Sequence, residues 1–170
     1  SVMTNNIDST QEVIEKALAK GYENVVVISE PVQDVSTREL RYETVKKTME
    51  KAGKGWKLLE VTDEDQLTES LPPIIADTRK NLLFASNGRV LMDVLAWLIQ
   101  HGIKIPEDVG ITGFDDWNLT ELVGPGITSI EQPSREIGKI AGQYLMDLLI
   151  KREIQREIIV PSVIRWRKSV

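Results

Sequence analysis

Apolar residues recur at two different spacings along this chain, and the two spacings alternate. Short apolar runs typical of buried parallel strands are separated by segments with helical periodicity. The runs predicted as strands are 25–28, 57–61, 82–85, 109–114 and 158–160, with shorter extended segments at 2–4 and 127–131. The segments predicted as helices are about 9–20, 36–52, 63–71, 89–101 and 133–151. This alternation predicts a parallel sheet flanked by helices, a three-layer α/β fold.

Polar pairs mark the expected starts of two helices. Ser9 with Glu12 and Ser36 with Glu39 have the spacing of a capping box, in which each side chain accepts a hydrogen bond from a free N–H of the other's residue. The proline pair at 72–73 is expected to interrupt the third helix, because proline lacks an N–H group.

Polar side chains also follow the predicted strands, and in open α/β sheets ligands bind beyond the carboxyl ends of the strands. Asp115 and Asp116 directly follow one strand, Asn87 follows another, and Arg38 and Arg41 begin the helix after the first long run. A carboxylate accepts from neighbouring hydroxyls, an amide accepts and donates, and a guanidinium donates a planar fork. Together these groups suit a polyhydroxylated ligand, whose apolar face an aromatic ring such as that of Trp117 can cover.

Each of these residues also has a purely structural interpretation. The aspartate pair and Asn87 can cap the helices that follow them, and the two arginines can be solvated. Trp117 can be a packing residue, His101 suits the negative end of a helix dipole, and Gly124-Pro125-Gly126 is typical of a turn. It is the shared location at strand ends that favours a binding site.

Composition excludes several classes of protein. The 170 residues include no cysteine and one histidine, and the formal net charge is −5. Cysteine chemistry is therefore impossible, we expect no metal or cofactor, and a DNA-binding face is not expected in this chain. No apolar run reaches the roughly 18 residues that span a membrane, so no membrane association is expected.

Enzyme and signalling alternatives fit less well. Adjacent residues on one chain usually point in different directions, which disfavours Asp115 and Asp116 as a hydrolytic acid–base pair. Neither GxGxxG nor GxxxxGK[ST] occurs. A response regulator would need acidic residues after the first strand, where Ser29-Glu30-Pro31 stands. We therefore expect no enzymatic activity.

Several motifs carry a family resemblance. The segment 105–116, Ile-Pro-Glu-Asp-Val-Gly-Ile-Thr-Gly-Phe-Asp-Asp, closely resembles a signature of the LacI/GalR transcription regulators. Residues 127–133 and 161–167, the pair Asn5-Asn6, and the segment from Ser36 to Arg41 resemble further motifs of that family. Two positions depart from it: Gly88 replaces an acidic residue, and Glu43-Thr44 replaces a common glycine.

The resemblance implies a two-lobed core like that of periplasmic binding proteins, with a small ligand in the cleft between the lobes. It assigns 1–130 to the C-terminal lobe, 131–157 to a crossover helix that belongs to the N-terminal lobe, and 158–170 to a segment that returns to the C-terminal lobe. It also implies that an N-terminal helix-turn-helix headpiece and most of the other lobe are absent from this chain.

The implied function is sensing of a sugar or sugar-acid effector by a cytoplasmic, homodimeric repressor of a carbohydrate-utilisation operon, which binds DNA through the headpiece. Positions matching Arg41, Asn87 and Asp115 contact the effector in the family, and Gln132 lies beside them at the lobe crossover. The secondary candidates are Arg38, Phe114, Asp116 and Trp117. The alternative is a sugar-binding protein of an uptake system, which shares the fold.

Two helices are expected to use apolar faces for association. In the helix at 89–101, Leu91, Val94, Leu95 and Leu98 can face the sheet, and the apolar side chains left over form a candidate dimer interface. They are Met92, Ala96 and Ile99 on one flank, with Val90 and Trp97 on the other. The helix at 133–151 carries an apolar stripe, which the resemblance places against the absent lobe. Without that lobe the helix could dock on its own lobe, pair with a neighbouring chain or fray, and we expect pairing.

Overall fold

The computed structural model describes residues 1–117, 119–150 and 157–170. Its larger sheet has six strands, and all neighbouring pairs run parallel except the last, in which the strands are antiparallel. Their order across the sheet is β3 (Gly55–Glu60), β2 (Asn24–Ser29), β4 (Asn81–Ala85), β5 (Gly110–Phe114), β6 (Thr128–Glu131) and β8 (Val163–Arg165).

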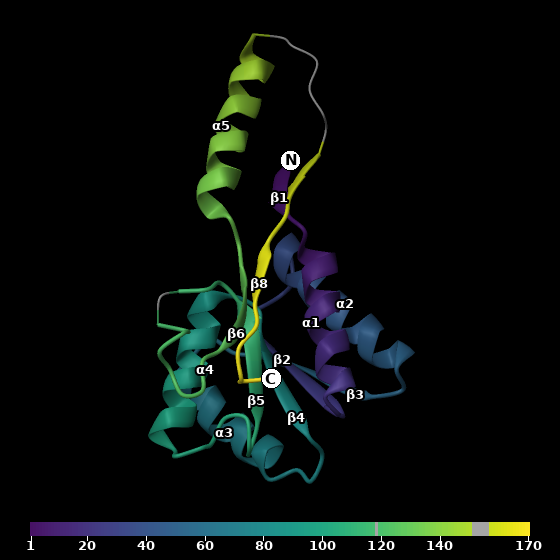
Figure 1. Cartoon of the computed structure of the whole chain (residues 1–170), viewed down its shortest axis with the longest axis vertical. Helices are drawn as coiled ribbons and strands as arrows, with labels where there is room; N and C mark the ends of the chain where they lie inside the picture. Colours follow the sequence, from purple (N-terminus) through teal and green to yellow (C-terminus); the bar gives the residue numbers. More distant parts are fainter. Residues whose placement is uncertain (118, 151–156) are drawn as a thin grey trace.

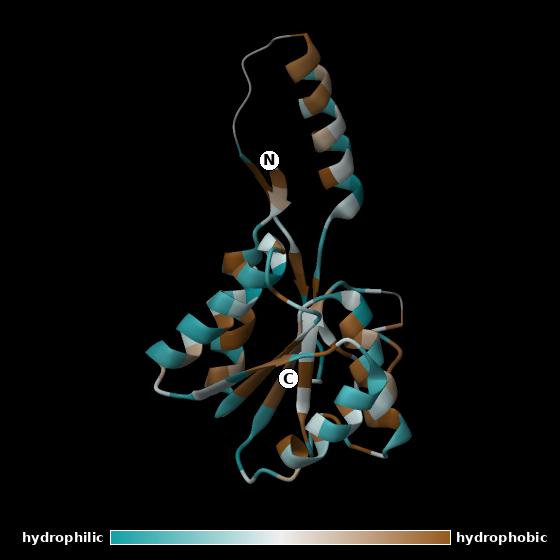
Figure 2. Ribbon diagram, turned by 180° about the vertical axis from the view of Figure 1, so that it is seen from behind, coloured by the Kyte–Doolittle hydropathy of each residue, from teal (hydrophilic) through white to brown (hydrophobic). Residues whose placement is uncertain are grey.

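Helices cover both faces of this sheet, which confirms the predicted three-layer α/β fold (Figure 1). They are α1 (Asn6–Ala19) and α2 (Ser36–Lys51) on one face, and α3 (Glu64–Ile75) and α4 (Gly88–Gln100) on the other. Alternate residues of β2 enter opposite cores, because successive side chains of a strand point to opposite faces. Val25 and Val27 pack towards α1 and α2, whereas Val26 and Ile28 pack towards α3 and α4. Figure 2 shows apolar residues along the central strands, whereas the flanking helices carry both apolar and hydrophilic residues.

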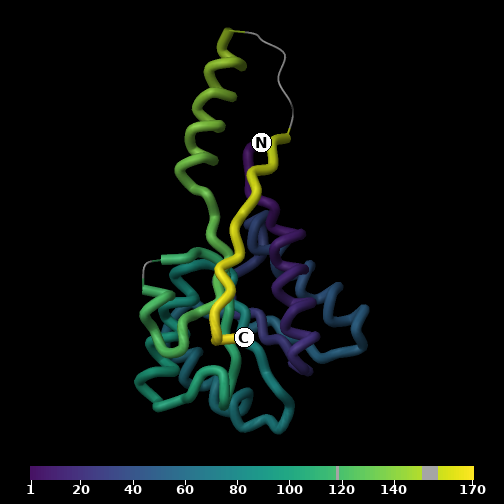
Figure 3. Tube along the Cα trace, in the orientation of Figure 1, coloured from purple at the N-terminus to yellow at the C-terminus, as the bar shows by residue number. Residues whose placement is uncertain are grey.

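Three elements lie apart from the six-stranded sheet. Strand β1 (Val2–Thr4) pairs in parallel with β7 (Ile158–Val160), and helix α5 (Ser134–Leu149) lies against β1. Figures 1 and 3 show α5 projecting away from the rest of the molecule. No α5 residue is buried, and Leu145, Leu148 and Leu149 are exposed. The helix is thus not docked on its own lobe. Of the three outcomes considered above, docking is therefore not seen in this structure.

Three short connections join these elements to the six-stranded sheet and its helices. They are Asn5 between β1 and α1, Gln132-Pro133 between β6 and α5, and Pro161-Ser162 between β7 and β8. The side chain of Asn5 ties two of them together, since its Oδ1 accepts hydrogen bonds from Ser162 N (2.7 Å) and Ser162 Oγ (2.8 Å).

The predicted capping boxes are wrong. Helix α1 begins at Asn6, so Ser9 lies inside it and donates to the carbonyl of Asn5, four residues earlier. In α2 the N-cap is Val35, and Glu39 instead accepts from the backbone N–H of Asp34.

Other sequence expectations differ from the structure in detail. Helix α3 continues through Pro72 and Pro73 to Ile75. Both prolines are exposed, whereas Leu71 and Ile74 on either side are buried in the core. Packing of this face compensates for the lost backbone hydrogen bonds. Strand β8 was not predicted, and the predicted end of the last helix at 151 lies outside the described residues.

Candidate functional site

Arg41 is the centre of a hydrogen-bond network at the carboxyl edge of the sheet. Its Nε donates to Asn6 Oδ1 (2.8 Å), Nη1 to the Ser86 carbonyl (2.5 Å) and Nη2 to Gln132 Oε1 (3.0 Å). The guanidinium Cζ lies 3.4 Å from the centroid of the Phe114 ring, in a cation–π contact. One side chain on α2 thus joins the start of α1, the end of β4 and the connection after β6.

The guanidinium is almost fully removed from water, with only 4% of Arg41 exposed. Burial lowers the pKa of Arg41 to about 10, and the nearby charge of Asp115 offsets part of this effect. Arg41 therefore remains a cation at neutral pH and is not a solvated helix residue.

Asp115 receives two hydrogen bonds at the same edge. Its Oδ1 accepts from Gln132 Nε2 (2.6 Å), and its Oδ2 accepts from the backbone N–H of Gly88 (2.9 Å), at the start of α4. The backbone of Asp115 has φ = 71°, in the left-handed region that few non-glycine residues adopt. Asp115, Gln132 and Arg41 thus form one continuous chain of hydrogen bonds.

Asn87 belongs to a second group of polar side chains. Its Oδ1 caps α4 by accepting from Val90 N (3.0 Å), so the structural interpretation of this residue is correct. Its Nδ2 also donates to Glu30 Oε2 (3.0 Å), and the same carboxylate forms an ion pair with Arg38. Arg38 therefore belongs to this second group and not to the Arg41 network.

Trp117 lies against the position at which the sequence departs from the family pattern. A Cβ atom added at Gly88 would lie 2.8 Å from Trp117 Cζ2 and 2.9 Å from Asp115 Cβ. The ring thus occupies space that a side chain at position 88 would need, while 46% of Trp117 stays exposed. Phe114, by contrast, is buried beneath Arg41 and offers no free face to a ligand.

Asp116 contacts different partners from Asp115, as expected for adjacent residues. Arg167 Nη1 and Nη2 donate to its two carboxylate oxygens (2.7 and 3.2 Å), and Ser129 Oγ donates to Oδ1 (2.6 Å), as does Thr120 Oγ1. Burial alone would raise the pKa of Asp116, but the hydrogen bonds from Arg167, Ser129 and Thr120 outweigh it and lower the pKa to about 2.

Sequence reasoning missed two members of the site. Glu30 directly follows β2, and this position at a strand end was the available signal. Asn6, which accepts from Arg41, lies in the Asn5-Asn6 pair that was noted for its family resemblance only.

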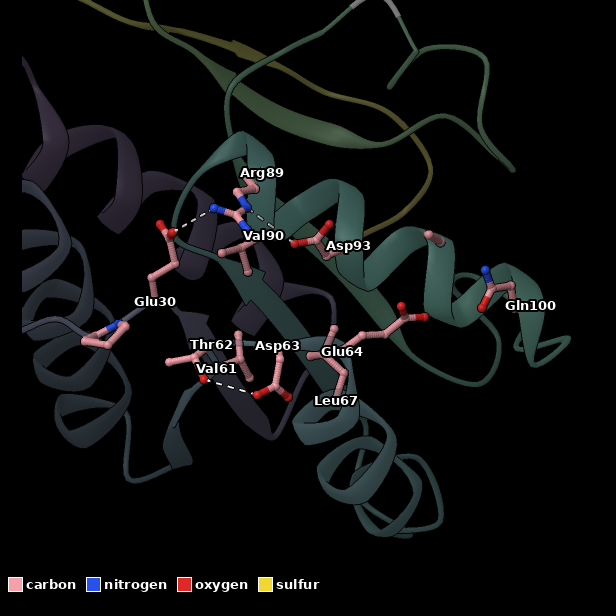
Figure 4. A pocket seen from close by; sticks show the side chains of 12 residues that line it. Glu30, Val61, Thr62, Asp63, Glu64, Leu67, Arg89, Val90, Asp93 and Gln100 are labelled. Carbon is pink, nitrogen blue, oxygen red and sulfur yellow. Dashed lines mark hydrogen bonds and ion pairs between the residues drawn. The ribbon is translucent and has the colours of Figure 1, made fainter.

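Two hollows flank the network without containing Arg41, Asn87 or Asp115. One, of about 440 Å³, lies between α3, α4 and the ends of β2 and β3. Figure 4 shows Glu30 directed towards Arg89 at its edge. These two residues form an ion pair, in which Glu30 Oε1 lies 3.6 Å from Arg89 Nη1. The other, of about 850 Å³, follows the corner between β6 and α5 and includes Gln132.

The expected interface on α4 is reduced to one flank. Ile99 is 59% exposed, Ala96 is exposed and Met92 is half-buried. Trp97 is only 3% exposed, because its Nε1 donates to Thr68 Oγ1 on α3 (3.1 Å) and its ring stacks on His101. The placement of Trp97 at a free surface is therefore wrong, whereas the structural interpretation of His101 agrees with this contact.

Comparison with known proteins gives consistent relatives. A family model described as a periplasmic binding protein-like domain matches residues 14–170. The HTH-type transcriptional regulator KdgR of Bacillus subtilis (strain 168) is 32% identical over 176 residues, which cover 100% of this chain and 50% of that protein. The chain thus spans about half the length of this curated relative.

Solved structures show the same fold. The probable maltose operon transcriptional repressor malR from Staphylococcus aureus superposes with a TM-score of 0.90 at 20% identity, over 99% of this chain and 61% of that one. A LacI family transcriptional regulator from Enterococcus faecium, with bound ribose, has a TM-score of 0.84 at 20% identity, over 99% of this chain and 64% of that one.

A parallel sheet with polar side chains at its carboxyl edge, which continues into a separate helix and a two-stranded sheet, is the arrangement of one lobe of a periplasmic-binding-protein-like domain. The chain belongs to the periplasmic binding protein-like domain family. It is similar over its whole length to an HTH-type transcriptional regulator, and a LacI family regulator of known structure shares its fold. These relatives are regulators, in agreement with the expectation that the chain is not an enzyme. Within the described ranges, no helix is both long and apolar enough to cross a membrane.

Proposed function

We propose that this chain senses a sugar or sugar-acid effector at the carboxyl edge of its sheet, through Arg41, Asn87, Asp115 and Gln132. The observation that supports this most strongly is the continuous network from Arg41 through Gln132 to Asp115. It presents a cationic donor, an amide and a carboxylate within one small region, as a ligand with several hydroxyls requires. The ribose bound to the E. faecium regulator is consistent with this class of ligand.

The same network gives the effector a means of changing the arrangement of the chain. Arg41 holds Asn6, which directly follows the connection at Asn5, and Gln132, which belongs to the connection after β6. Ligand hydroxyls that compete for these hydrogen bonds would stabilise one geometry of the connections over another. Only such a difference in affinity between two arrangements can shift their populations.

The proposal extends to the regulator as a whole. We propose that β1, α5 and β7 belong to a second lobe, and that the effector closes or opens the cleft between the two lobes. We further propose that the whole protein is a cytoplasmic repressor of a carbohydrate-utilisation operon, whose DNA-binding headpiece responds to this movement. The α4 flank of Met92, Ala96 and Ile99 would join two copies of the C-terminal lobe. The exposed apolar residues of α5 are consistent with a missing partner surface.

A binding experiment tests the effector assignment. The protein is screened by thermal shift against pentoses, hexoses and their aldonic and uronic acids. At least one compound should raise its unfolding temperature, because a ligand that binds the folded state stabilises it. Calorimetry with that compound should then show at least a tenfold weaker affinity for Asp115→Ala. A tenfold loss is about 1.4 kcal/mol, which lies within the ~1–3 kcal/mol expected for lost buried hydrogen bonds.

The matched control is Asp65→Ala, which removes an exposed carboxylate at the start of α3. It should bind with unchanged affinity. Equal affinities of the wild type and Asp115→Ala would remove Asp115 from the effector site.

A further inference from the structure

Asp116 and Arg167 form an ion pair that is more extensive than a surface salt bridge. Two parallel hydrogen bonds join the guanidinium to the carboxylate, and the side chains are only 15% and 16% exposed. Bidentate pairs of this kind fix orientation as well as distance. Ser129 and Thr120 add two further donors, so every contact of the carboxylate is directional.

Arg167 is in turn anchored to the start of β6. Its Nη1 donates to the Ile127 carbonyl (2.7 Å), and its backbone N–H donates to Thr128 Oγ1 (2.9 Å), which donates to the Arg167 carbonyl (3.0 Å). Its side chain also packs on Gly126, where an added Cβ would lie 3.1 Å from Arg167 Cδ. The guanidinium is therefore a fixed point.

Asp115 stands immediately before this fixed carboxylate and needs support. Its left-handed backbone, with φ = 71°, is a conformation that persists only when the surroundings impose it. Its own N–H donates to the Ile130 carbonyl (2.9 Å), which fixes the residue from the N-terminal side. The contacts of Asp116 fix it from the C-terminal side.

We propose that the Asp116–Arg167 pair is a positioning device for Asp115, which holds that carboxylate on Gly88 N and Gln132 Nε2. The inference rests on the proposed function in so far as Asp115 is an effector contact. Neither Asp116 nor Arg167 touches the effector; both act through the backbone of Asp115. The competing explanation is that the pair only attaches the C-terminal segment to β6.

Amide hydrogen exchange separates these explanations, because the Gly88 N–H reports directly on the Asp115 carboxylate. Exchange is measured by NMR on the chain without any ligand. In Arg167→Gln, the Gly88 amide should exchange at least tenfold faster than in the wild type. Arg167→Lys, which retains the charge but not the fork, should give an intermediate rate.

The matched control is Arg165→Gln. It removes the same charge two residues away, from an exposed pair with Glu131 (2.7 Å), and should leave the Gly88 rate unchanged. A role confined to attachment predicts faster exchange at Arg167 and in β8, with no change at Gly88.

Asp116→Asn provides a second, milder variant that keeps the shape of the side chain, so the test does not depend on the folding of Arg167→Gln. It should also accelerate exchange at Gly88. Unchanged Gly88 exchange in whichever of these variants fold would overturn the proposal. Because no effector is present, a failure of the sugar assignment would leave this result intact, and the two ideas fail separately.

Discussion

Replacing Arg41 by methionine should destabilise the folded chain even in the absence of an effector. The substitution keeps an unbranched apolar side chain over the Phe114 ring but removes all three hydrogen bonds that the guanidinium donates. The buried Ser86 carbonyl, the buried Asn6 side chain and the half-buried Gln132 each lose a donor.

The size of the effect follows from the burial of these acceptors. Leaving one buried acceptor without a donor costs about 1–3 kcal/mol. Gln132 is half-buried and can turn towards water, whereas the Ser86 carbonyl is fixed at the end of β4. Burying the charged guanidinium costs free energy in the wild type, and methionine does not carry this cost, which offsets part of the lost stability. We therefore expect a net destabilisation of about 2–4 kcal/mol, which for 170 residues lowers Tm by about 5–15 °C.

Thermal unfolding followed by circular dichroism at pH 7 measures this difference. The control is Lys47→Met, which removes an exposed cation from the same helix and should change the stability by less than about 0.5 kcal/mol. If the Tm of Arg41→Met fell within 2 °C of the wild-type value, the guanidinium would not hold the connections together, and its place in the network would be incidental.

Three further predictions concern pH, packing and association. The pKa of Asp116 is about 2 in the folded chain and 3.8 ordinarily, so its contribution of about 2 kcal/mol is complete above about pH 5 and is lost as the pH falls towards 2. Urea unfolding at pH 5 and pH 2.5 should therefore show a smaller acid loss of stability for Asp116→Asn than for the wild type, and equal losses would contradict the ion pair. Gly88→Ala should displace the Trp117 ring, and an unchanged tryptophan emission spectrum would argue against that contact. Met92→Glu combined with Ile99→Glu should give a soluble monomer by sedimentation, whereas a persistent dimer would place the interface elsewhere.

Much of the fold follows from the sequence because burial on both faces leaves a readable pattern. The strands Asn24–Ser29, Asn81–Ala85 and Gly110–Phe114 are buried along their whole length, so each is largely apolar in sequence. The edge strand Val163–Arg165 is exposed at alternate residues and is only three residues long, too short for its alternation to show.

The site was predicted less completely than the fold. The strand-end rule brings Asp115 and Asn87 to one edge, but it does not say which side chains will touch. The hydrogen bonds of Arg41 to Asn6 and of Asn87 to Glu30 depend on rotamers and on the distance between elements, which no local pattern encodes. The wrong prediction for Trp97 has the same cause. Helix α3 covers a flank of α4 that a helical wheel shows as free, and a wheel of one helix contains no information about its neighbours.

The three connections that leave the six-stranded sheet have few torsions with which to move. Two contain a proline, Pro133 and Pro161, whose ring fixes φ, and the third is the single residue Asn5, whose side chain is bonded to Ser162. Strand β7 pairs with β1 in the two-stranded sheet, and β8 pairs with β6 in the six-stranded sheet. Only Pro161 and Ser162 separate β7 from β8 along the chain. Rotation between the two sheets therefore requires correlated changes of a small number of φ and ψ angles in all three connections, so no connection can move independently of the other two.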